Sequence, residues 1–111
     1  MNHNGLARGY MAKSLPEEKF LYHVAACVEK QLKYWSEENS LLLILGKNTN
    51  ELFVSQRESV FHIDIPDWIV KQKKGLDPYS LDRYIWSELI RKGLEIESKS
   101  NYIKLILKSL K

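Results

Sequence analysis

The first residues that could do chemistry are His62 and Asp64, which are separated by one residue in a segment of alternating apolar and polar character. On a strand, alternate residues point to the same face, so these two side chains would lie side by side. A histidine beside a carboxylate can ligate a metal ion or act as an oriented base. Either role needs a further ligand or a nucleophile, for which the candidates are Asp67, Glu58 and His23. The sequence has no histidine pair spaced to share a helix face, so we predict no metal ligand, no cofactor and no catalytic residue.

Two other features associated with enzymes have simpler explanations. Gly46-Lys47 is part of a phosphate-binding loop pattern, but that pattern requires glycine at position 41 and serine or threonine at position 48, where this chain has Leu41 and Asn48. We therefore interpret the dipeptide as part of a hairpin turn. Cys27 lies within an apolar helical segment, where burial raises a thiol pKa, so we interpret it as a core residue. A non-catalytic protein is favoured over an enzyme.

The segment from Tyr79 to Lys92 is the most aromatic predicted helix of the chain. At helical spacing its apolar residues form two lines, which together cover nearly half of the helix surface. The first line consists of Leu81, Ile85 and Leu89. The second, with one arginine beside it, gives the set Tyr79, Arg83, Trp86 and Ile90. Since tyrosine, tryptophan and arginine are enriched at interface hot spots, we predict that this set binds a protein partner or a second copy of the chain. The alternative is that Trp86 packs beneath the C-terminal segment.

The basic residues are concentrated in the C-terminal third. Residues 1–38 carry five basic and five acidic side chains and residues 39–70 carry two and four, whereas residues 71–111 carry ten and five. Such an asymmetry is compatible with an acidic partner, including nucleic acid. The cations that would contact phosphates are Lys71, Lys73, Lys74, Arg91 and Lys92. Nucleic-acid binding is therefore the alternative function, although acidic residues are interspersed and no nucleic-acid motif is present.

Composition indicates a small globular protein. The chain of 111 residues is 44% hydrophobic and 28% charged, with a mean hydropathy of -0.37. Its longest uncharged apolar run, Leu41 to Leu45, is far shorter than the roughly 20 residues of a membrane helix. The first twenty residues lack the apolar core of a secretion signal, and Cys27 is the single cysteine. These features predict a cytoplasmic protein with no membrane contact.

The N-terminal part predicts a tail followed by a helix. Residues 1–13 contain two glycines and two asparagines without helical periodicity, so we predict a flexible tail followed by a single α+β domain over residues 14–111. Ser14 and Glu17 have the spacing of a capping box, which predicts a helix start. The apolar stripe of this helix should pack on a sheet and consists of Leu21, Val24, Ala25, Val28, Leu32 and Trp35.

Three short segments between turn-forming residues predict a small antiparallel sheet, namely residues 41–45, 51–55 and 59–65. The first is apolar throughout, as expected for a strand covered on both faces. The third alternates between apolar and polar residues, as expected for a half-buried strand. Residues 51–61 would also fit a helix, which is the main alternative.

Helix start and stop signals follow the sheet. Pro66-Asp67 opens a short helix that Gly75 would end in a left-handed conformation. A second helix runs between Asp77-Pro78 and Gly93. Residues 94–111 alternate like strands but also suit a helix, which we favour from about Asn101 onward.

The predicted fold class is therefore α+β, with an N-terminal helix, a three-stranded antiparallel meander and C-terminal helices packed on one sheet face. The predicted role is that of a non-catalytic binding or regulatory module acting through protein contacts.

Overall fold

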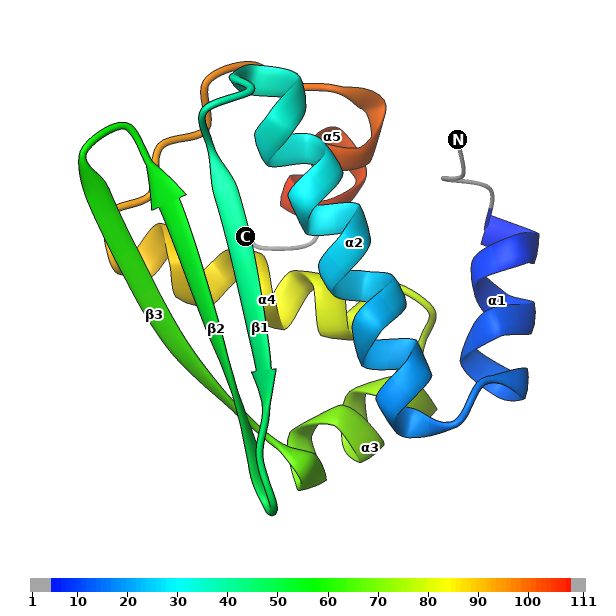
Figure 1. Ribbon diagram of the computed structural model, residues 1–111. Helices are drawn as coiled ribbons and strands as arrows, with labels where there is room; N and C mark the ends of the chain where they lie inside the picture. Colours follow the sequence, from blue (N-terminus) through cyan, green and yellow to red (C-terminus); the bar gives the residue numbers. More distant parts are fainter. Residues whose placement is uncertain (1–4, 109–111) are drawn as a thin grey trace.

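A computed structural model describes residues 5–108 and has the predicted α+β architecture, in which helices pack on a small antiparallel sheet. Two helices precede the sheet and three follow it (Figure 1). The elements are α1 (Gly5–Ser14), α2 (Glu17–Trp35), β1 (Ser40–Leu45), β2 (Thr49–Gln56), β3 (Ser59–Pro66), α3 (Asp67–Leu76), α4 (Ser80–Arg91) and α5 (Asn101–Lys108). None of the described helices is long and apolar enough to cross a membrane.

The three strands form a meander in the order β1-β2-β3, with antiparallel pairing throughout. Residues 51–61, for which a helix was the alternative, belong to β2, a tight turn and β3. Alternate residues of β2 and β3 are buried under the helices, including Leu52, Val54, Ile63 and Ile65, each at most 1% exposed. In Figure 1, α4 passes behind the strands and α2 runs beside β1.

The prediction that β1 is covered on both faces is wrong. β1 lies at one edge of the sheet, and its residues alternate between half-buried and exposed. Leu41, Leu43 and Leu45 pack against the core, whereas Leu42 and Ile44 are 57% and 44% exposed on the opposite face. A strand that is apolar on both sides therefore has one covered face only.

The predicted capping box at the start of α2 is also wrong, because a helix already occupies the preceding residues. Ser14 is the last residue of α1, and α2 begins after Pro16, which offers no side-chain hydrogen bond to the first turn. The predicted apolar stripe of α2 does form the core contact, with Leu21, Val24 and Val28 at most 1% exposed.

Residues 5–13, predicted to be a flexible tail, instead form most of α1. This helix has little apolar periodicity, and what fixes it to the rest of the chain is Arg8, whose side chain is fully buried against Asp82 of α4. The prediction of a flexible tail was based on the lack of apolar periodicity. It was wrong because an ion pair between residues far apart in the chain attaches α1 to α4. Residues 1–4 lie outside the described residues.

The C-terminal helices follow the predicted boundaries with one exception. Gly93 ends α4 with φ of 111°, and the backbone N–H groups of Gly93 and Leu94 donate back to α4 carbonyls. The helix predicted from Asn101 is confirmed over Asn101–Lys108, and residues 109–111 lie outside the described residues. Gly75 does not end α3, which continues to Leu76 and gives way to extended backbone at Asp77.

Candidate functional site

The predicted contact surface on α4 is not formed, because its central residue belongs to the core. Trp86 is fully buried, with Trp35 and Tyr102 packed edge-on at centroid distances of 5.8 and 6.4 Å. Tyr79 is 8% exposed and Ile90 is half-buried. Arg83 forms an ion pair with Asp77. The alternative interpretation, that Trp86 packs beneath the C-terminal segment, is confirmed.

Trp86, the central residue of the second apolar line of α4, belongs to a buried polar network. Arg8 donates to both carboxylate oxygens of Asp82 and, over 2.9 Å, to the carbonyl of Pro78. The Tyr102 hydroxyl donates to Asp82 over 2.6 Å and accepts from the Trp86 indole over 3.1 Å. Burial raises the pKa of Asp82, and the Arg8 charge and the hydrogen bonds oppose that rise. These groups are inaccessible to a ligand, so the network joins α1, α4 and α5 rather than forming an active site.

The lone cysteine lies beside a histidine on α2. Cys27 Sγ is 3.8 Å from His23 Nε2, and burial raises the pKa of the thiol while it lowers the pKa of His23. Both shifts favour the neutral forms, so the pair is not a preformed thiolate nucleophile.

The basic residues of the nucleic-acid prediction fall into two groups. Lys71, Lys73 and Lys74 lie on α3, and two of them line a cavity of about 410 Å³ shared with α1. Arg91 and Lys92 lie at the far end of α4, a helix about 18 Å long at 1.5 Å per residue. Arg91 pairs with Glu88, and the Lys92 ammonium donates to the carbonyl of His62. The structure does not assemble the five cations into one surface.

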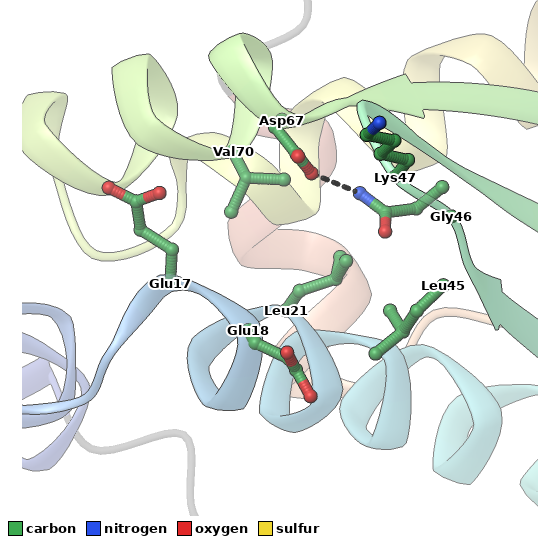
Figure 2. Close-up of a pocket in the computed structure, with 9 residues that line it drawn as sticks. Glu17, Glu18, Leu21, Leu45, Gly46, Lys47, Asp67 and Val70 are labelled. Carbon is green, nitrogen blue, oxygen red and sulfur yellow. Dashed lines mark hydrogen bonds between the residues drawn. The ribbon is translucent and has the colours of Figure 1, made fainter.

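Gly46-Lys47 belongs to the β1–β2 hairpin and borders a cavity of about 250 Å³. Figure 2 shows three carboxylates around this cavity, those of Glu17, Glu18 and Asp67, the last accepting a hydrogen bond from Asn50 over 3.0 Å. Acidic walls disfavour a phosphate. A Cβ at Gly46 would come within 2.4 Å of the Thr49 carbonyl oxygen, so the turn itself requires glycine there.

The candidate site is the sheet face that the helices leave uncovered, which we call the open face. It consists of Ser40, Leu42, Ile44, Thr49, Glu51, Phe53, Ser55, Val60, His62 and Asp64. Leu42, Ile44 and Val60 are 57%, 44% and 68% exposed. The rings of Phe53 and His62, which face each other across β2 and β3, stack at a centroid distance of 4.6 Å.

A polar cluster lies on the same face. His62 Nε2 is 3.0 Å from Glu51 Oε1 and 3.5 Å from Asp64 Oδ1. The pairing of His62 with Asp64 along β3 was predicted, but the third member was not. Glu51 directly faces Asp64 across the β2–β3 pair. The strand register would have identified it, since a three-stranded meander with a two-residue turn after Gln56 brings these positions together. Asp67, Glu58 and His23, the partners considered from sequence, do not join the cluster.

Comparisons of the chain with protein families, curated proteins and solved structures find no match.

Proposed function

We propose that this protein is a non-catalytic binding module that binds a second copy of itself. The contact surface is β1, which contributes its unpaired strand edge and its residues on the open face. The observation that carries this proposal is the position of β1. This strand is uncharged and, after Ser40, consists of leucines and one isoleucine, a composition suited to the middle of a sheet, yet it lies at the edge.

The edge of β1 lacks the features that prevent association between strands. Residues 40–45 contain no lysine, no other charge and no proline. Within residues 5–108, the backbone hydrogen bonds outside regular elements include none from β1. Its outward N–H and C=O groups are therefore available to another strand.

A second copy fits this edge by symmetry. Two antiparallel β1 strands related by a twofold axis present the same surface to each other, as closed dimers require. Pairing centred on Leu43 places Leu42 of one chain opposite Ile44 of the other on the open face. No like charges meet, because the strand carries none. The dimer would have a continuous six-stranded sheet with β1 in its interior.

The size of the contact sets the expected strength. A six-residue strand spans about 20 Å, so strand pairing alone gives a contact at the small end of specific interfaces. We therefore expect a dimer that dissociates on dilution. Since the contact is apolar, its stability should change little with moderate salt, in contrast to nucleic-acid binding.

The experiment is sedimentation or light scattering over a concentration series, comparing Leu42→Lys with Val60→Lys. Both residues are exposed on the open face, but Leu42 lies on β1 and Val60 on β3. We expect the wild type and Val60→Lys to dimerise and Leu42→Lys to remain monomeric, with melting temperatures of the monomers unchanged. A wild type that stays monomeric at every concentration contradicts the proposal, as does equal loss in both variants.

A nucleic-acid titration in the same instrument tests the alternative function. Our proposal predicts no mass increase with mixed-sequence DNA or RNA at low salt. Binding that weakens steeply as salt rises would instead favour the basic residues of α3 and α4.

A cytoplasmic location is part of the proposed role and rests on the single cysteine, Cys27.

A further inference from the structure

We infer that the open face carries a binding site for a divalent transition-metal cation of the Zn²⁺ type, with His62 Nε2 and the carboxylates of Glu51 and Asp64 as its protein ligands. These side chains come from adjacent positions of β2 and β3 in one chain, so the site does not depend on self-association.

The spacing of the ligand atoms matches such an ion. Zn²⁺ binds nitrogen and oxygen at about 2.1 Å, so two ligands in a tetrahedral site lie about 3.4 Å apart. The nitrogen of His62 is 3.0 Å from a Glu51 oxygen and 3.5 Å from an Asp64 oxygen. All three ligand atoms lie within 4.8 Å of one another. The two distances from the histidine nitrogen therefore already lie close to the separation expected around one ion.

The structure holds the histidine in place before any ion arrives. The His62 ring stacks on Phe53 at an interplanar angle of 29°, which fixes the ring plane and directs Nε2 toward both carboxylates. The Lys92 ammonium donates to the His62 carbonyl and ties β3 to the end of α4. Glu51 and Asp64 face each other in a hydrogen-bonded strand pair. Ligands on paired strands lose little freedom on binding an ion.

Charge also favours a cation at this point. With neutral imidazole, the cluster carries two negative charges, and among residues 7–108 neither carboxylate pairs with a lysine or an arginine. The side chains of His62, Glu51 and Asp64 are 40%, 46% and 65% exposed, so water can occupy the remaining coordination positions. One nitrogen and two oxygens suit Zn²⁺ or Mn²⁺ better than Ca²⁺ or Mg²⁺, which prefer oxygen alone.

The experiment is calorimetric titration of the full chain with Zn²⁺, repeated with Mg²⁺. The test variants are Glu51→Gln, which keeps the side-chain size, and His62→Gln. The matched controls are His23→Gln and Cys27→Ser, which disrupt the histidine–thiol pair on α2, a second set of groups that can ligate Zn²⁺. Melting curves without metal establish that each variant is folded. The test positions His62 and Glu51 are 40% and 46% exposed, and the control positions His23 and Cys27 are half-buried and receive substitutions close in size.

We expect the wild type and both controls to bind one Zn²⁺ per chain and Mg²⁺ far more weakly. Each test variant should weaken Zn²⁺ binding by about tenfold or more, since even outer-shell substitutions reach that size. Broadening of the amide NMR signals of residues 51, 62 and 64 by Mn²⁺ should locate the ion. Absence of Zn²⁺ binding, or binding that survives both test variants, overturns the inference. Glu51→Gln should weaken Zn²⁺ binding without changing the monomer–dimer equilibrium, which is measured as the mass of the assembly in solution. A failure of the metal site can therefore be distinguished from a failure of the proposed dimer.

Discussion

The buried ion pair between Arg8 and Asp82 leads to a quantitative prediction about folding. Arg8→Met removes the charge but retains an apolar side chain of similar length. Both partners of the ion pair are 0% exposed, so Asp82 would remain buried, and among the described residues the Tyr102 hydroxyl would be its remaining side-chain donor. Removing one partner of a buried ion pair costs about 3–5 kcal/mol in the free energy of unfolding. That loss is comparable to the total stability of many domains of this size.

The assay is equilibrium urea denaturation followed by circular dichroism. Lys13→Met is the control, since Lys13 is an exposed residue of the same helix and loses the same charge. It should change the free energy of unfolding by no more than about 0.5 kcal/mol. The double variant Arg8→Met with Asp82→Leu should lose less than the sum of the two single variants, because no unpaired charge remains buried. Equal, small losses for Arg8→Met and Lys13→Met would refute the burial of Arg8 and the attachment of α1 by this ion pair.

Two further predictions concern α4. Trp86→Ala should lower the free energy of unfolding by about 3–5 kcal/mol, because the indole is fully buried and its loss also leaves the Tyr102 hydroxyl without the indole hydrogen bond; thermal melting checks this. Burial alone would raise the pKa of Asp77, but the Tyr79 backbone N–H and the Arg83 guanidinium outweigh it and lower that pKa. A carboxylate whose pKa is lower in the folded than in the unfolded state stabilises the fold at pH values above the unfolded-state pKa, and this stabilisation is lost as the pH falls. The melting-temperature difference between wild type and Asp77→Asn should therefore disappear below about pH 4. The gap at neutral pH should correspond to less than about 1 kcal/mol because the pair is partly exposed, and a gap that widens in acid would contradict the assignment.

The elements of the sheet were predictable because one face of each strand must be buried. β3 alternates in sequence, and its burial alternates in the structure at Ile63 and Ile65. The end of α4 was predictable for a different reason, since Gly93 adopts the positive φ that other residues avoid. Both signals are local, and each depends only on the residue type and its immediate neighbours.

The features that the sequence did not reveal depend on partners far along the chain. α1 is held by contacts between Arg8 and residues 70 and 74 positions away, and a charged residue in a polar segment gives no local sign of that. Trp86 is covered by Tyr102 and Trp35, from α5 and α2, so the apparent excess of apolar surface on α4 was the core of a three-helix contact. Glu51 was overlooked because its position beside His62 follows from strand register, which a single strand does not encode.

The division between the two sides of the sheet determines which substitutions affect which property. The buried network of Arg8, Asp82 and Tyr102 lies on the helical side, where each residue is at most 2% exposed and substitutions act on stability. The residues of the open face, including Leu42 and Glu51, make few buried contacts, so their substitution should leave folding nearly unchanged while altering binding. A change on the open face that unfolded the protein would therefore show that this face is covered in the native state, and that the dimer is part of the fold rather than an association of folded chains.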